Sequence, residues 1–287
     1  MEFLAPANWA EALAAKAEYP EALPIAGGTD VMVELNFDRR RPVALLDLGR
    51  VAELTEWGGD GDLIRVGAGV TYRRIITELG ARLPGLALAA RTVGSPQIRN
   101  RGTVGGNLGS ASPAGDAHPP LLACGALVEL GSVRGTRRVP VAEFFTGPKR
   151  SVRAPDELIA AILVPPAGGP QQFAKVGTRN AMVIAVCSFA LSLEPLARRI
   201  GTGIGSAGPT PLTAGPAEEL LAAELSWEDA GALPESLSRR FGDLVAAAAT
   251  PIDDVRGTAA YRRHALAVLA RRTLHWAWRE HREGGRR

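Results

Sequence analysis

The stretch RGTVGGNLGSASPAGD, residues 101–116, combines closely spaced glycines with small polar side chains and ends in a carboxylate, Asp116. Glycine lets an anion approach the main chain because no Cβ stands in the way, and the successive N–H groups of such a turn point outward. We therefore expect this stretch to wrap a phosphate group and to offer Asp116 to the ribose or adenine of a nucleotide.

A second glycine loop occurs earlier in the chain, where AGGTD (residues 26–30) follows a short apolar segment and precedes a candidate helix. The N-terminus of a helix is a favourable place for an anion. Taken alone, this loop is equally consistent with an ordinary turn between two elements. Two such loops in one chain are more specific, because together they suit a pyrophosphate held from both sides.

A third glycine motif, residues 203–208, matches the G-x-G-x-x-G pattern of dinucleotide-binding loops. That pattern requires a helix to begin at its last glycine. Pro209 and Pro211 follow immediately, and Pro211 demands an extended residue before it. We therefore exclude a nucleotide-binding role for this motif.

The composition is typical of a globular protein, with 46% hydrophobic and 22% charged residues in a chain of 287. Cys124 and Cys187 lie apart in apolar surroundings, and the four histidines show no metal-ligand spacing. We therefore predict no metal site and assign no catalytic residue. The net charge of only +3 predicts no nucleic-acid surface.

The N-terminus and the longest apolar run suggest neither a signal peptide nor a membrane span. The N-terminus lacks the basic and apolar regions of a signal peptide. The longest apolar run, residues 182–193, is shorter than the roughly 20 residues that span a bilayer. We expect a cytoplasmic protein without a membrane span, in which residues 182–193 form a buried strand or core segment.

Local patterns predict an alternation of helices and strands. Asn8 followed by Glu11 resembles a capping box that opens a helix, and Thr71 is expected to cap a helix ending at Leu79. Residues 84–120 show little periodicity and are expected to form a long, ordered, functional segment. The other expected features are strands at 43–48, 63–70, 126–130, 137–141, 157–165, 173–177 and 182–193, a turn at 58–62, a lobe boundary at 165–170, and helices at 217–225 and from Ala259 onward.

These residues resemble a known family, the FAD-binding (medium) subunits of the molybdenum hydroxylases. The family includes the medium subunit of carbon monoxide dehydrogenase and the flavin domain of xanthine dehydrogenase. The resemblance covers nearly the whole chain and is strongest at residues 26–30, 92–126 and 253–274.

The resemblance implies an α+β fold of the vanillyl-alcohol-oxidase or PCMH type, with two lobes that enclose FAD and a smaller C-terminal α+β domain. The expected divisions are a first FAD-binding lobe at residues 1–57, a second at 58–168, the C-terminal flavoprotein domain at 171–280 and a basic tail at 281–287.

The resemblance also implies which residues contact the FAD. One side of the pyrophosphate would meet residues 25–31, the other side residues 103–110, and Asp116 would bond the adenosine ribose. Ile159 and Lys175 would lie against the cofactor, although Lys175 is equally consistent with a surface position on an edge strand. The complete implied set is Ile25, Ala26, Gly27, Gly28, Thr29, Asp30, Val31, Thr103, Gly105, Gly106, Asn107, Ser110, Asp116, Ile159 and Lys175.

The implied function is electron transfer. Partner chains, an iron–sulfur small subunit and a molybdopterin large subunit, would supply electrons, which pass through FAD to NAD or oxygen. An alternative is a self-sufficient FAD-dependent oxidase or reductase of the same fold, for which no convincing general base stands out. A second alternative is a scaffold that has lost its flavin, against which the two glycine loops argue.

Overall fold

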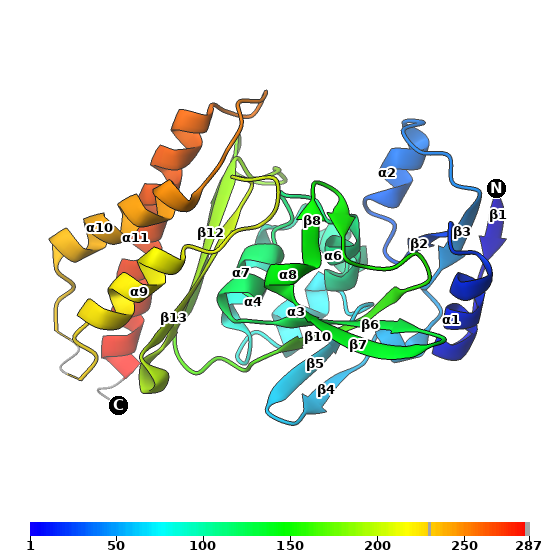
Figure 1. Cartoon of the computed structure of the whole chain (residues 1–287), viewed down its shortest axis with the longest axis horizontal. Coiled ribbons are helices and arrows are strands. Elements are labelled where there is room, and N and C mark those ends of the chain that lie inside the picture. The colour runs from blue at the N-terminus through cyan, green and yellow to red at the C-terminus, as the bar shows by residue number, and fades with distance from the viewer. Residues whose placement is uncertain (229–230, 285–287) are drawn as a thin grey trace.

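The computed structural model describes residues 1–228 and 231–284. Within these residues the chain forms three main sheets and a short two-stranded pair. The sheets follow one another along the long axis of the molecule, with the N-terminus near one end and the C-terminal helices at the other (Figure 1).

The N-terminal sheet is parallel, with strand order β1-β3-β2. The predicted first helix is confirmed, because Asn8 Oδ1 accepts a hydrogen bond from the Glu11 main-chain N–H at 2.9 Å. The glycine loop at 26–30 joins the strand β2 to a short helix, as expected. The elements of this part are β1 (Glu2–Leu4), α1 (Trp9–Glu18), β2 (Leu23–Ile25), α2 (Val31–Asn36) and β3 (Ala44–Asp47).

The central sheet is antiparallel, with strand order β4-β5-β10-β6-β7. The predicted turn at 58–62 is confirmed at Gly61 and Asp62, where the chain reverses with a φ of 60° at Gly61, but residues 58–60 belong to a strand, Trp57–Asp60. Hydrogen bonding to β5 stabilises this glycine-rich strand. The strands are β4 (Trp57–Asp60), β5 (Leu63–Gly67), β6 (Leu127–Ser132), β7 (Gly135–Pro140) and β10 (Leu158–Val164).

Residues 84–120 are ordered, as expected, but most of them are helical rather than loop. Two of their short helices begin after a side-chain cap: Ser95 Oγ accepts from Ile98 N, and Thr103 Oγ1 accepts from Gly106 N. Thr71 caps the preceding helix as predicted. The helices are α3 (Tyr72–Glu78), α4 (Pro84–Thr92), α5 (Pro96–Arg101), α6 (Val104–Ser110) and α7 (His118–Ala123). Smaller elements are η1 (Ala52–Leu54), α8 (Val141–Phe144), β8 (Phe145–Gly147) and β9 (Arg150–Ser151).

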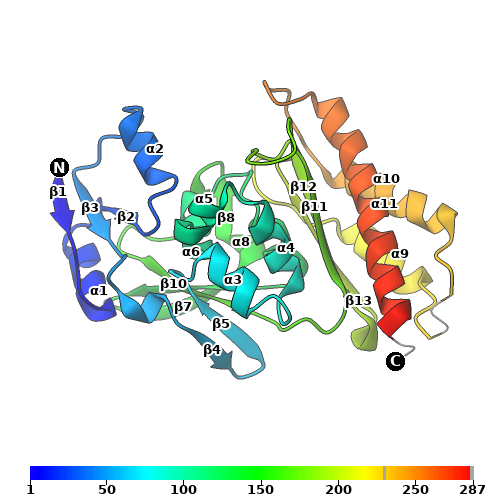
Figure 2. The same ribbon diagram turned by 180° about the vertical axis from the view of Figure 1, so that it is seen from behind.

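The C-terminal sheet, β11-β12-β13, carries three helices on one face, while α4 and α7 contact it from the central part (Figure 2). Strand β12 begins only at Cys187, so the predicted strand at 182–193 is too long, and Met182 and Ile184 are exposed. Neither β13 nor α10 was expected from the sequence. The elements are β11 (Gln171–Val176), β12 (Cys187–Glu194), η2 (Pro195–Ala197), β13 (Arg199–Gly205), α9 (Gly215–Glu224), α10 (Glu235–Ala248) and α11 (Ala259–Gly284).

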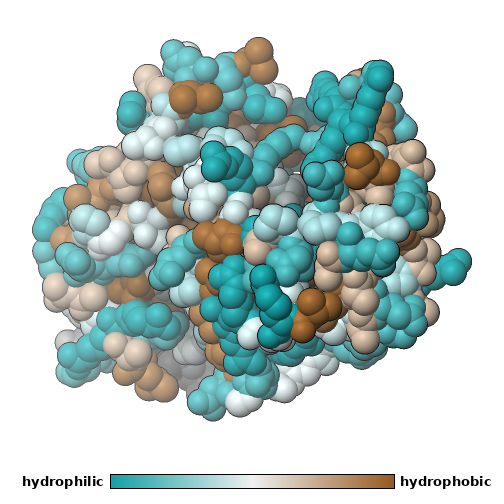
Figure 3. Space-filling model, turned by 45° about the vertical axis from the view of Figure 1, so that its right-hand side comes forward, coloured by the Kyte–Doolittle hydropathy of each residue, from teal (hydrophilic) through white to brown (hydrophobic). Residues whose placement is uncertain are grey.

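The last helix is longer than predicted. It includes residues 281–284, which were assigned to the basic tail, whereas residues 285–287 lie outside the described residues. Within the described ranges, no helix is both long and apolar enough to cross a membrane. On the face shown in Figure 3, hydrophobic residues form small groups separated by hydrophilic ones.

Strand β13 explains the third glycine motif. A Cβ on Gly201 would lie 1.8 Å from the Ala123 carbonyl oxygen, and a Cβ on Gly203 would lie 2.0 Å from the Pro119 carbonyl oxygen. These glycines therefore let helix α7 rest directly on the strand. No helix begins at Gly208, so the motif lacks the helix that a dinucleotide fingerprint requires. Cys124 and Cys187 are buried, as expected.

Candidate functional site

A cavity of about 320 Å³ lies where the N-terminal part meets the central part of the chain. Its walls come from the β2–α2 loop, from α6, from the turn between β5 and α3, and from the start of β10. The two glycine loops, far apart in sequence, therefore line one cavity. Twelve of the predicted site residues line it: Ala26, Gly27, Gly28, Thr29, Asp30, Val31, Thr103, Gly105, Gly106, Asn107, Ser110 and Ile159.

The first glycine loop offers free main-chain donors to the cavity. Within residues 1–228 and 231–284, the N–H groups of residues 27–30 donate to no protein acceptor. Gly28 adopts φ of 75°, in the left-handed region that favours glycine. A Cβ on Gly27 would lie 1.9 Å from the Arg101 carbonyl oxygen, so the two loops touch at this glycine.

Helix α6 presents one face to the cavity. Thr103, Gly106, Asn107 and Ser110 recur at the spacing that places residues on one side of a helix, and all four line the cavity. Gly105 also borders it, although a Cβ there would lie 2.4 Å from the Ala68 Cβ, so this glycine is needed for close packing. The small residues of the second loop thus serve two purposes, access to the cavity and packing of α6.

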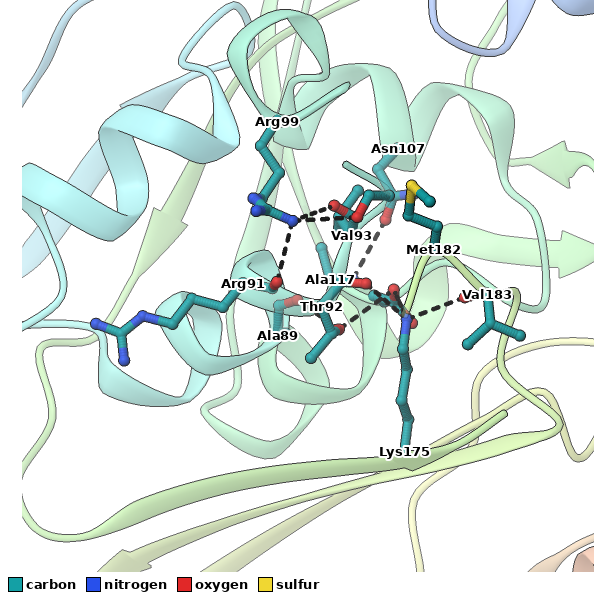
Figure 4. A network of polar contacts seen from close by, with 12 residues as sticks. Ala89, Arg91, Thr92, Val93, Arg99, Asn107, Ala117, Lys175, Met182 and Val183 are labelled. Carbon is teal, nitrogen blue, oxygen red and sulfur yellow. Dashed lines mark hydrogen bonds and ion pairs between the residues drawn. The ribbon is translucent and has the colours of Figure 1, made fainter. Parts of the chain in front are cut away.

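Three predicted site residues do not line the cavity: Ile25, Asp116 and Lys175. Lys175 extends from β11 toward Thr92 and Val183, as Figure 4 shows. Its Nζ donates to Asp116 Oδ2 at 2.6 Å, to the Thr92 carbonyl at 2.9 Å and to the Val183 carbonyl at 3.2 Å. Lys175 therefore lies on an edge strand, as the alternative had it, but its side chain is only 9% exposed and joins β11 to the end of α4 and to the segment between α6 and α7, so a surface position is wrong.

Asp116 is buried beside this lysine. Its Oδ1 atom has no hydrogen-bond partner among the described residues, whereas Oδ2 accepts from Lys175. Burial raises the pKa of Asp116, while the Lys175 ammonium opposes that shift. A buried carboxylate oxygen without a donor is costly, so this side chain has capacity for one more partner.

The turn that follows α4 was not predicted as part of the site, yet Val93 and Ile98 line the cavity. Arg99 holds this turn closed, since its Nη1 donates to the carbonyls of Arg91, Val93 and Gly94 at 3.0 to 3.2 Å (Figure 4). The apolar residues Val93 and Ile98 were the feature of the sequence from which this part of the cavity wall could have been predicted.

Three cations that the sequence analysis did not single out also line the cavity: Arg40, Lys149 and Arg153. Lys149 Nζ donates to Glu34, and this hydrogen bond holds the pKa of Glu34 below its ordinary value. Arg153 makes no hydrogen bond or ion pair with the described residues, and burial lowers its pKa. Glu157 is near enough to oppose this shift but forms no ion pair with Arg153, and a half-buried guanidinium without such a pair favours an anionic ligand.

These features fit the diphosphate of a flavin dinucleotide. Unpaired main-chain donors, polar side chains on one face of α6 and an unpartnered arginine surround a single cavity. In the described ranges, no group of three or more His, Cys, Asp or Glu side chains has the arrangement of a metal site. The free main-chain donors and the arginine therefore suit an anionic organic cofactor.

Comparison with known proteins agrees with this site. A family model for the FAD binding domain in molybdopterin dehydrogenase matches residues 1–167, and a model for the CO dehydrogenase flavoprotein C-terminal domain matches residues 172–277. The chain is 34% identical over 261 residues to the nicotine 6-hydroxylase medium subunit of Paenarthrobacter nicotinovorans, covering 87% of each chain.

Two further relatives span almost the whole length. A putative xanthine dehydrogenase FAD-binding subunit of Escherichia coli is 30% identical over 280 residues, which is 93% of this chain and 92% of the relative. The fold matches a chain in a solved structure of carbon monoxide dehydrogenase from Hydrogenophaga pseudoflava with a TM-score of 0.89 and 28% identity, covering 98% of both chains.

Fold and site together define a flavin-binding oxidoreductase subunit with an α+β, PCMH-type fold. The chain belongs to the family of FAD-binding medium subunits of the molybdenum hydroxylases, and its cofactor is FAD. The resemblance found in the sequence is therefore confirmed.

Proposed function

We propose that this chain transfers electrons within a larger enzyme, from iron–sulfur centres of a partner through its own FAD to NAD or oxygen. Bound FAD supplies the redox chemistry, and the residues described above bind and orient it. The observation that carries the proposal is the single cavity lined by both glycine loops, within a chain whose relatives are named as medium or FAD subunits.

The proposed partners are an iron–sulfur small subunit and a molybdopterin large subunit. The names of relatives support this assembly, since they include a carbon monoxide dehydrogenase medium chain and a subunit of the 6-hydroxypseudooxynicotine dehydrogenase complex. In the described ranges, the chain itself presents no cluster of metal-binding side chains.

Within the site, we propose that residues 25–31 and 103–110 contact the pyrophosphate from opposite sides. The unpaired N–H groups of residues 27–30 support the first contact. Asp116 would hydrogen-bond the cofactor through its unpartnered Oδ1. Ile159, which lines the cavity, and Lys175, which orients Asp116, complete the set.

We further propose that residues 1–57 and 58–168 act as the two lobes around FAD and that residues 171–280 form the C-terminal domain. The separate sheets of these three parts and the family matches at residues 1–167 and 172–277 support this division.

The first test is to purify the chain and identify its cofactor. We expect a yellow protein that releases FAD, and not FMN, when it is denatured. Because no histidine or cysteine belongs to a predicted flavin-linking motif, the flavin should be released by acid precipitation. A colourless protein that cannot be reconstituted with FAD would contradict the assignment.

The second test concerns assembly. Co-expression with candidate iron–sulfur and molybdopterin subunits should give one complex on size-exclusion chromatography, and substrate should bleach its flavin. The FAD-loaded chain alone should not turn over a purine, an aldehyde or carbon monoxide. Turnover by the lone chain would refute the subunit function and would support the self-sufficient oxidase instead.

A further inference from the structure

Tyr72 occupies an unusual place at the edge of the cavity. It is the first residue of α3, its main-chain N–H donates to the Gly102 carbonyl at 3.0 Å, and its side chain is only 2% exposed. Its ring lies against the second glycine loop, since a Cβ on Gly102 would be 3.4 Å from Tyr72 Cδ2. Tyr72 is one of the residues that line the cavity, and it lies beside the loops that contain Thr29 and Thr103.

The Tyr72 hydroxyl has no hydrogen-bond partner. Of the described residues, six have a buried side-chain polar atom without a partner: Tyr72, Asp116, His118, Ser206, Arg262 and Arg271. Tyr72 is the member of this group that lines the cavity. A buried donor left unsatisfied costs free energy, whereas phenylalanine would fill the same space without that cost.

This hydroxyl remains a donor at all physiological pH values. Burial raises the pKa of Tyr72 well above its usual value, and the carboxylates of Asp116 and Asp30 raise it further. Since the hydroxyl keeps its proton, it can satisfy its hydrogen-bonding capacity by donating to an oxygen on whatever fills the cavity.

We propose that the Tyr72 hydroxyl donates a hydrogen bond to an oxygen of the bound FAD, in the diphosphate or the sugar-alcohol chain beside it. Tyr72 lies beside the loops that contain Thr29 and Thr103. Because these loops are the proposed diphosphate site, its hydroxyl should meet this part of the cofactor and not the flavin or adenine ring. Tyr72 is thus a cofactor-binding residue, and this inference rests on the proposed placement of FAD between the two loops.

The experiment compares the full-length protein with its Tyr72→Phe variant, each first freed of flavin. Two quantities are measured: the dissociation constant for FAD, from flavin fluorescence, and the denaturation midpoint of the apoprotein. We expect FAD binding to weaken about tenfold, as the loss of one hydrogen bond implies. The apoprotein should be as stable as before or more stable, because the variant removes an unsatisfied donor.

The opposite directions of these two effects separate cofactor binding from a structural role. Tyr261→Phe is the matched control, since Tyr261 is exposed on α11 and is absent from the cavity wall, and it should alter neither quantity. Unchanged FAD affinity in Tyr72→Phe, or a less stable apoprotein, would overturn the inference while the proposed function stands. Failure of the unmodified chain to bind FAD would overturn both.

Discussion

Lys175 Nζ lies 2.6 Å from Asp116 Oδ2, and this ion pair joins the C-terminal sheet to the segment between α6 and α7. Both side chains are about nine-tenths buried. Removing one partner of a buried pair leaves an uncompensated charge, and this is strongly destabilising. The pair therefore stabilises the contact between two parts of the chain beside the flavin site.

The first prediction tests this pair. Lys175→Met should lower the free energy of unfolding of the apoprotein by about 3 kcal/mol, because Asp116 would remain buried without its cation. Urea denaturation measures the change. In the double variant Lys175→Met/Asp116→Asn, the loss should be smaller than the sum of the two single losses. Additive effects would show that the two side chains do not stabilise each other.

The second prediction separates two neighbouring glycines. A Cβ on Gly106 would meet one atom within 4 Å, Thr103 Oγ1 at 3.0 Å, whereas a Cβ on Gly105 would lie 2.5 Å from the Ala68 carbonyl oxygen. Gly106→Val should fold but bind FAD about tenfold more weakly or worse, because the side chain occupies cofactor space. Gly105→Ala should instead lower the free energy of unfolding by about 1–3 kcal/mol.

Flavin absorbance per protein and thermal denaturation measure these two outcomes. Full flavin occupancy in folded Gly106→Val would mean that the second loop does not contact the cofactor. The expected effect of Gly106→Val comes from volume alone, since this glycine is not among the residues with positive φ.

The third prediction concerns Arg153. Because this guanidinium has no anionic partner among the described residues, Arg153→Met should weaken FAD binding by about tenfold or more, as expected for a hydrogen bond to a charged group. The dependence of FAD affinity on salt should also decrease. Arg150→Met is the control, since Arg150 is exposed and outside the cavity wall. Equal effects of the two substitutions would contradict a specific role for Arg153.

The fourth prediction is a pH dependence caused by His118. Burial lowers the pKa of this completely buried histidine from its ordinary value of 6.5 to about 4. Between these pH values the unfolded chain binds a proton that the native chain does not. The contribution of His118 is therefore fully present above pH 6.5 and is lost as the pH falls toward 4, by about 1.4 kcal/mol per pH unit.

Urea denaturation across this pH range, compared with His118→Gln, isolates the contribution. Glutamine retains a group that can donate to the Asn107 carbonyl, which His118 Nε2 contacts at 3.2 Å. The variant should show a shallower slope than the unmodified chain. Identical slopes would mean that His118 is not the responsible group.

The sequence predicted the first glycine loop and its flanking elements because their signals are local: an apolar strand, glycines, and a helix after them. The helix caps at Asn8 and Thr71 could also be predicted from the sequence, because a capping side chain accepts a hydrogen bond from a main-chain N–H in the first turn of its own helix. Helix α10 also carries a local signal that was missed, with Leu237, Phe241 and Val245 buried at intervals of four residues.

Other features depend on contacts that no local pattern contains. Strand β13 is rich in glycine, a poor strand former; it is paired with β12 over its whole length, and its glycines permit the close approach of α7. Tyr72 and Arg153 become part of the cavity wall only when α3 and the segment before β10 meet the N-terminal loop. Their ordinary sequence surroundings therefore held no sign of a place in this wall.

The contact between α7 and β13 bears on how the molecule can move. Gly201 and Gly203 oppose main-chain carbonyls, so a slide of the helix by one pair of strand residues would place the Arg199 side chain where a glycine now stands. The contact therefore resists a slide of α7 toward Arg199, whereas a slide toward Gly205 would bring only glycines against the same carbonyls. A partner that displaces the C-terminal sheet would therefore also act on α7, whose His118 Nε2 contacts the carbonyl of Asn107 in the wall of the flavin site.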